Sequence, residues 1–157
     1  MHSQKYLSLE IPRMPKGVGV EFGNTYAYPY ASVATTSTHD MSGIRQWWEE
    51  DPSATQRYYN QVLWHDGAAP AQATPQLCRE MVSKCLDAPS MLCILPLQDW
   101  MAMDGNLLGA DAADERINVP ANSRHYWRYR MHITLEQLQA DASFAALVAD
   151  CIKQSGR

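Results

Sequence analysis

The sequence predicts an α/β fold with parallel strands, and two segments carry that prediction. Residues 31–37 are small and β-branched, and they run into His39-Asp40 with a helical pattern directly behind. Residues 91–97 are almost wholly apolar, as a strand buried on both faces should be, and they run into Gln98-Asp99. Parallel strands that deliver polar side chains to their carboxyl ends are typical of a sheet or barrel whose C-terminal rim carries the chemistry.

The N-terminal part predicts one short strand and a long loop. Residues 6–11 alternate apolar and polar side chains, as a half-buried strand does, and Pro12 and Pro15 end the pattern. Residues 16–30 hold three glycines and alternating tyrosines, and we expect them to form the loop that leads into the next strand.

Helical patterns fill the region between the two main strands. Residues 41–50 predict a first helix. Asp51-Pro52 predicts a second helix, to about residue 63, because Asp caps a helix and proline suits its first position. Thr74-Pro75 repeats that signal and opens a helix to about residue 86. Trp47 and Trp48 are adjacent on the first helix, so at least one is expected in the core.

The C-terminal third predicts a loop followed by short helices. Residues 100–103 form a short helical piece, and residues 104–123 have a loop composition. Thr134 and Gln137 have the spacing of a capping box. Ser143 is expected to cap a last helix with an apolar face made of Phe144, Leu147, Val148, Cys151 and Ile152.

Composition indicates one compact soluble domain. The chain has 157 residues, 46% of them hydrophobic, and a formal net charge of −4, which argues against a nucleic-acid partner. No segment approaches the roughly 20 apolar residues of a membrane span, and residues 1–6 lack the apolar core of a signal peptide, so we expect a cytoplasmic protein with no membrane partner. Four cysteines without metal-site spacing are expected to be reduced, mostly buried thiols: Cys78, Cys85, Cys93 and Cys151.

Several motifs occur in an order that resembles the C-terminal part of a known enzyme family. The main ones are Thr38-His39-Asp40, Pro96-Leu97-Gln98-Asp99 and Glu115-Arg116-Ile117-Asn118-Val119-Pro120, with supporting segments at 13–15, 19–23, 47–51, 88–91 and 125–130. Over roughly residues 7 to 140 the chain is similar to the 4-alpha-glucanotransferases, the amylomaltases and disproportionating enzymes of glycoside hydrolase family 77. Among these it most resembles the maltose-using disproportionating type.

The resemblance implies a helix-rich C-terminal fragment of a (β/α)8 TIM-type barrel, holding its last two or three β/α units. A whole barrel takes about 250 residues, more than this chain has. We expect a first strand and loop in 1–30, the last two β/α units in 31–99, and a rim loop with C-terminal helices in 100–157. The rest of the parent barrel is then a partner, and open sheet edges predict self-association.

The resemblance gives Asp40 a catalytic role. Retaining cleavage of a glycosidic bond uses one carboxyl group as nucleophile and another as acid/base. Asp40 matches a third carboxylate of the family, which binds sugar hydroxyls and stabilises the transition state, and His39 matches the histidine beside it. The alternative for Asp40 is a helix N-cap, because a helical pattern begins directly after it.

The family's nucleophile and acid/base have no counterpart here. In the family both lie upstream of the strand that leads to Asp40, where this chain offers only Glu10 and Glu21. Neither acid has the strand-end setting of the family's acid/base, so the chain alone is expected to be inactive.

Further substrate contacts are expected at Gln98, Asp99, Asn118 and Pro120. The alternative for the first two is helix capping and a surface amide. Ala121 stands where the family usually has Gly. Two further contacts are expected. Glu115 and Arg116 form a local ion pair, and the last helix packs against Tyr126, Trp127 and Tyr129.

The expected function is that of a segment of a 4-alpha-glucanotransferase, which transfers glucosyl or maltodextrin units between α-1,4-glucans. The resemblance places this activity in maltose, starch or glycogen metabolism. No cofactor or metal is implied, because phosphate-loop, metal-ligand and serine-hydrolase motifs are missing from the sequence. The alternative is a non-catalytic carbohydrate-binding or scaffolding module.

Overall fold

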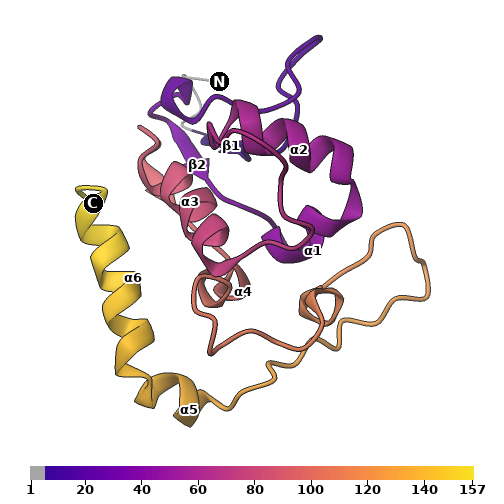
Figure 1. The fold of residues 1–157 in the computed structure, drawn as a ribbon, viewed down its shortest axis with the longest axis vertical. Coiled ribbons are helices and arrows are strands. Elements are labelled where there is room, and N and C mark those ends of the chain that lie inside the picture. The colour runs from indigo at the N-terminus through magenta and orange to yellow at the C-terminus, as the bar shows by residue number, and fades with distance from the viewer. Residues whose placement is uncertain (1–5) are drawn as a thin grey trace.

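A computed structural model describes residues 6–157 and shows a small parallel sheet with helices packed on it (Figure 1). The strands β1 (Ser8–Glu10), β2 (Ser32–Ala34) and β3 (Leu92–Cys93) lie in the order β1-β2-β3. Leu9 pairs with Val33 and Val33 with Leu92, both in parallel register. The predicted α/β class with parallel strands is confirmed.

Helices make up most of the regular structure, and α1, α2 and α3 connect β2 to β3. Figure 1 shows α5 and α6 beyond a long loop that runs away from the sheet. No helix within residues 6–157 has both the length and the apolar character needed to cross a membrane. The helices are η2 (Thr25–Ala27), α1 (Ile44–Glu50), α2 (Pro52–Gln61), α3 (Pro75–Leu86), α4 (Leu97–Met101), η3 (Ala112–Glu115), α5 (Leu135–Ala140) and α6 (Ala142–Gln154).

Three helix starts follow the predicted capping. Asp51 caps α2 and Thr74 caps α3, each with proline at the next position. Thr134 and Gln137 form both hydrogen bonds of a capping box at the start of α5. In each case the residues that define the helix start are close neighbours in sequence.

The cap predicted for the last helix was wrong. Asp141, and not Ser143, caps α6, because its carboxylate accepts a hydrogen bond from the amide of Phe144 at 2.9 Å. The Ser143 hydroxyl donates to the same carboxylate at 2.7 Å. Of the predicted apolar face of α6, Phe144 and Cys151 are buried and Leu147 and Val148 are half-buried, whereas Ile152 is 37% exposed.

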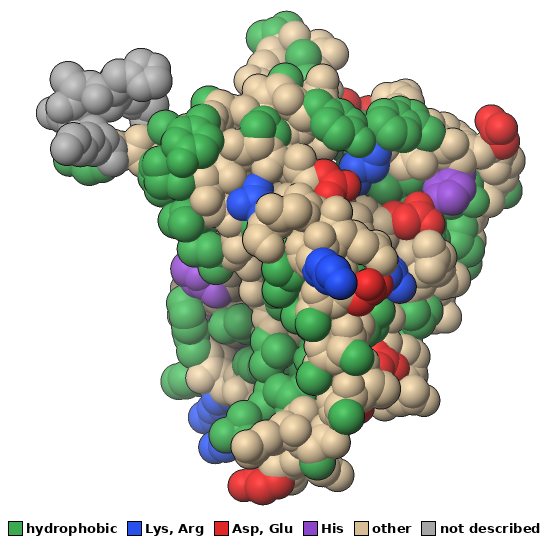
Figure 2. Space-filling model, turned by 90° about the vertical axis from the view of Figure 1, so that its left-hand side faces the viewer, with side chains coloured by type: hydrophobic (Ala, Val, Ile, Leu, Met, Phe, Trp, Pro, Cys, Tyr) green, Lys and Arg blue, Asp and Glu red, His purple; other side chains and the backbone are tan. Residues whose placement is uncertain are grey.

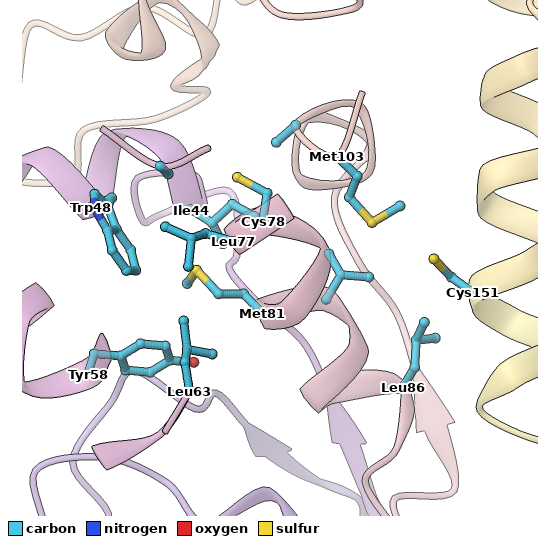
Figure 3. Close-up of a cluster of buried hydrophobic side chains, with 13 residues drawn as sticks. Ile44, Trp48, Tyr58, Leu63, Leu77, Cys78, Met81, Leu86, Met103 and Cys151 are labelled. Carbon is cyan, nitrogen blue, oxygen red and sulfur yellow. The ribbon is translucent and has the colours of Figure 1, made fainter. Parts of the chain in front are cut away.

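The main hydrophobic core lies between α1, α2 and α3, and Figure 3 shows its side chains pointing toward one another. Trp48 of α1 and Tyr58 of α2 are each 1% exposed, and Met81 of α3 is 2% exposed. Trp48 confirms that one of the two adjacent tryptophans is a core residue. Cys151 brings α6 into contact with this core.

All four cysteines are free thiols, and three of them are buried. Burial raises the pKa of Cys78 to about 12 and that of Cys93 to about 11. The Cys78 and Cys93 thiols are therefore protonated at neutral pH, as expected of structural cysteines.

The strand predicted at 91–97 is shorter and less buried than expected. Only Leu92–Cys93 joins the sheet, and Leu92 and Ile94 are 42% and 60% exposed. Leu9, Val33 and Leu92 are register partners, so their side chains lie on one face of the sheet. The opposite face carries Ala34, which is fully buried in a cluster with the helices.

The sheet therefore has one face covered by helices and one apolar face, marked by Leu9, Leu92 and Ile94, that is open. Figure 2 shows a side of the molecule on which hydrophobic side chains take up a large share of the surface.

Candidate active site

Residues 35–42 follow β2 as a polar segment that two buried side chains hold in place. One is Asp99 of α4, which is 1% exposed. Its Oδ2 accepts hydrogen bonds from the hydroxyls of Thr36 and Ser37, the former at 2.5 Å. Its Oδ1 accepts one from the amide of Ile44 at 2.9 Å. A carboxylate with three donors thus ties the end of β2 to the start of α1.

The other buried side chain is Arg13, which is 7% exposed. Its Nε donates to the carbonyl of Thr36 at 3.1 Å, and its guanidinium also donates to the carbonyl and hydroxyl of Ser42. Burial lowers the pKa of Arg13, and the Asp99 and Glu50 carboxylates oppose that shift. The sequence did not assign Arg13 this role, because its partners lie 23 and 29 positions away.

Asp40 and His39 stand at the exposed tip of this segment. Their side chains are 52% and 56% exposed, and His39 Nε2 lies 3.5 Å from Asp40 Oδ2. The Nδ2 of Asn118 donates a hydrogen bond to Asp40 Oδ1 at 2.7 Å. The structure thus brings together three of the predicted site residues.

Asp40 does not cap a helix, which removes the alternative explanation for its position. Helix α1 begins at Ile44, and its N-cap residue is Gly43, which makes no side-chain capping bond. The amide of Ile44 is bound by Asp99 instead. The Asp40 carboxylate therefore faces solvent, with Asn118 and His39 as its neighbours.

Gln98 and Asp99 lie beneath this surface rather than on it, which corrects their prediction as substrate-binding residues. Gln98 is 8% exposed, and its Nε2 lies 3.5 Å from the carbonyl oxygen of Glu115. Burial closes both side chains to a bound sugar in this structure. The alternative role of Asp99, helix capping, agrees with the structure. Asp99 lies in α4, but the amide that it binds belongs to Ile44, the first residue of α1. Pro120 is exposed, two residues after Asn118.

Two ion pairs position the loop that carries Asn118. Arg45 of α1 pairs with Glu115, and their side chains are 13% and 11% exposed. Arg116 lies 3.2 Å from Glu50 and donates from Nε to the carbonyl of Asn118 at 3.0 Å. Burial raises the pKa of Glu115 more than Arg45 lowers it. The expected local pair between Glu115 and Arg116 is therefore wrong, since each bonds to α1.

Trp127 lies beside His39, a contact that the sequence did not predict. The two ring centroids are 5.2 Å apart, with the ring planes at 42°. Trp127 is 62% exposed and Tyr126 68%, so the expected packing of these two residues on the last helix is wrong. An exposed indole next to a polar cluster offers an apolar face to the C–H side of a pyranose ring.

The two acids that precede Asp40 are engaged elsewhere. Glu10 is 5% exposed and binds Lys16 and the hydroxyl of Ser8. Glu21 accepts hydrogen bonds from Arg57 at 2.6 and 2.8 Å. Over residues 6–157, no group of three His, Cys, Asp or Glu side chains is placed to hold a metal ion.

Comparison with known proteins gives a consistent family. The family described as 4-alpha-glucanotransferase matches residues 1–136. The rice (Oryza sativa subsp. japonica) protein 4-alpha-glucanotransferase DPE2 is 40% identical over 96% of this chain. The 4-alpha-glucanotransferase of Chlamydia muridarum is 31% identical over 78% of it. The chain spans 16% and 23% of the lengths of these two relatives.

The fold is also shared with a solved structure. The structure matches an amylomaltase from Streptococcus agalactiae, solved in complex with acarbose, with a TM-score of 0.70 at 17% identity. That match covers 99% of this chain and 28% of the amylomaltase chain. With the family match extending over most of its length, this chain belongs to the 4-alpha-glucanotransferase family.

Proposed function

We propose that this chain supplies one side of the active site of a 4-alpha-glucanotransferase, which transfers glucosyl or maltodextrin units between α-1,4-glucans. The observation that carries the proposal is the exposed cluster of Asp40, His39 and Asn118, held from beneath by Asp99 and Arg13. The names of the relatives support the activity, and the acarbose complex of the amylomaltase supports a carbohydrate substrate.

Asp40 is proposed to stabilise the transition state. Its carboxylate accepts hydrogen bonds from sugar hydroxyls, and these bonds strengthen as the ring approaches an oxocarbenium ion. The bond from Asn118 fixes the carboxylate and leaves Oδ2 available to the sugar. A ring nitrogen of His39 donates one hydrogen bond to the same sugar. The nucleophile and the acid/base come from outside the described residues.

We further propose that residues 31–99 form the last two β/α units of a (β/α)8 barrel, with residues 100–157 as the rim loop and outer helices. Two observations support this: the three strands lie side by side in chain order, and one face of the sheet is apolar and open. In a barrel that face turns inward and packs against the side chains of the other strands.

The substitution Asp40→Asn tests the catalytic role in the complete natural polypeptide that carries this chain. Asn keeps the shape of the side chain and removes its charge. Hydrogen bonds to a charged acceptor are worth about 1.5–3 kcal/mol, and a preorganised site adds to that. We expect maltose disproportionation to slow by roughly a hundredfold or more, with an unchanged melting temperature.

The exposed residue Asp66, on the loop between α2 and α3, provides the matched control, and Asp66→Asn should leave turnover unchanged. Near-normal turnover in Asp40→Asn would contradict the catalytic assignment. A natural polypeptide that binds maltodextrin without any transfer would favour the carbohydrate-binding module instead.

A further inference from the structure

A second aromatic surface lies on segments that contribute nothing to the Asp40 cluster. The rings of Tyr26 and Trp64 are parallel within 1°, with centroids 6.2 Å apart. Both side chains are exposed, at 57% and 66%. Tyr26 belongs to η2, between β1 and β2, and Trp64 follows the end of α2. Two large rings held parallel in solvent bury little of their own apolar area against each other, so packing alone does not explain them.

The backbone at Trp64 is held in an unfavourable conformation. Within residues 6–157, Trp64 is the one non-glycine residue with a positive φ, at 61°. This region costs a bulky L-residue free energy, and glycine normally takes such a position at a helix end. Gly67, three residues on, has a positive φ of 82°, so glycine is used nearby in the same loop. Observed strain of this kind points to a function for the side chain.

The two rings line a cavity of about 470 Å³, a size within the range of small-molecule sites. The cavity is open to solvent, and polar side chains surround the rings: Glu21, Asn24, Gln61 and Lys84. The ammonium of Lys84 lies over the face of the indole ring, 3.4 Å from its centroid, and 5.4 Å from the centroid of the Tyr26 ring. The site therefore combines two exposed aromatic rings with a cation over one face of the indole and with amides and a carboxylate nearby.

We propose that Tyr26, Trp64 and the surrounding cavity bind an α-glucan chain at a second site, apart from the Asp40 cluster. A pyranose ring presents an apolar C–H face with hydroxyls around its edge, which matches parallel rings bordered by an ammonium, amides and a carboxylate. The net charge of −4 opposes a nucleic acid as the occupant. The choice of an α-glucan as the ligand rests on the proposed function. The arrangement of the two rings is observed in the structure and is independent of it.

The test is affinity electrophoresis of the complete natural polypeptide in gels with and without soluble starch. Trp64→Gly removes the indole and relieves the positive φ, so this variant should keep or raise the melting temperature. We expect Trp64→Gly and Tyr26→Ala each to raise the apparent Kd for starch roughly tenfold. Turnover of maltose, which is too short to span both sites, should stay within about twofold of wild type.

Tyr30→Ala is the matched control, because Tyr30 is 69% exposed and lies outside the cavity lining. Unchanged starch retention in Trp64→Gly and Tyr26→Ala would overturn the proposal, as would retardation by oligo(dT) in place of starch. If Trp64→Gly fails to fold, Tyr26→Ala decides alone. The natural polypeptide could lack transferase activity and still be retained by starch through Trp64. That result would reject the proposed function but support a glucan-binding site at Tyr26 and Trp64.

Discussion

Asp40 and Asp99 follow neighbouring strands of the same sheet and differ completely in burial. Asp40 is half exposed, accepts a hydrogen bond from Asn118 and lies 3.5 Å from His39, whereas Asp99 is 1% exposed and accepts three hydrogen bonds. Sequence gives both the same setting, a carboxylate just beyond an apolar run. Only tertiary contacts distinguish Asp40, which is exposed to a ligand, from Asp99, which holds the segment that carries Asp40 in place.

Replacing Asp99 should therefore cost stability. Asp99→Ala leaves the hydroxyls of Thr36 and Ser37 and the amide of Ile44 buried without an acceptor. Each unsatisfied buried donor costs about 1–3 kcal/mol, so we expect a loss of roughly 3 kcal/mol or more in the free energy of unfolding. Thermal and urea denaturation of the natural polypeptide measure it. Asp40→Ala is the control, with an expected change below about 0.5 kcal/mol. Equal melting of the two variants would refute this division of roles.

Local signals predicted three helix starts, because a cap and its partners lie within one turn. Asp51-Pro52, Thr74-Pro75 and the Thr134–Gln137 box each mark a helix start in the structure. Strand lengths could not be predicted in this way, since a strand ends where its neighbour stops pairing. The start of α1 was also beyond local signals, because its cap comes from Asp99, 55 positions along the chain.

At the site, the sequence and its family resemblance predicted the exposed residues, but they missed the residues that contact them or hold them in place. His39, Asp40 and Asn118 came from motifs that are contiguous in sequence. Arg13 and Trp127 act through contacts between distant segments, which no spacing rule reveals. Gln98 and Asp99 were expected to contact the substrate, and their burial was missed because burial at a strand end depends on which distant segments pack over it.

The start of α2 offers a test at the level of a single element. Asp51 Oδ1 accepts hydrogen bonds from the amides of Ser53 and Ala54 at 2.9 and 3.0 Å. Asp51→Ala should lower the free energy of unfolding by about 1 kcal/mol, because two amides lose their acceptor. Asp51→Asn should cost much less, since Asn caps a helix about as well as Asp. Urea denaturation compares the two, and an equal loss in both would show that charge, and not the cap, matters here.

The open face of the sheet dominates the behaviour of the whole molecule. Parallel sheets in α/β proteins are normally covered on both faces, yet here Leu9, Leu92 and Ile94 remain 52%, 42% and 60% exposed on one side. This exposed apolar surface, together with free strand edges, favours association between copies of the isolated chain. It also fits the proposal that other strands of a barrel cover this face in the natural polypeptide.

We therefore expect the isolated 157-residue chain to self-associate and to lack transferase activity. Light scattering and sedimentation over a wide concentration range should show a mass that rises with concentration. Ile94→Lys places a charge on the open face and should shift the population toward monomer, because burying an unpaired ammonium between copies is costly. Val18→Lys, at a fully exposed position away from the sheet, should leave the association unchanged. A monomer at all concentrations would mean that the open face does not mediate association. Glucose release by the pure chain that is abolished by Asp40→Ala would place the nucleophile and the acid/base within the 157 residues.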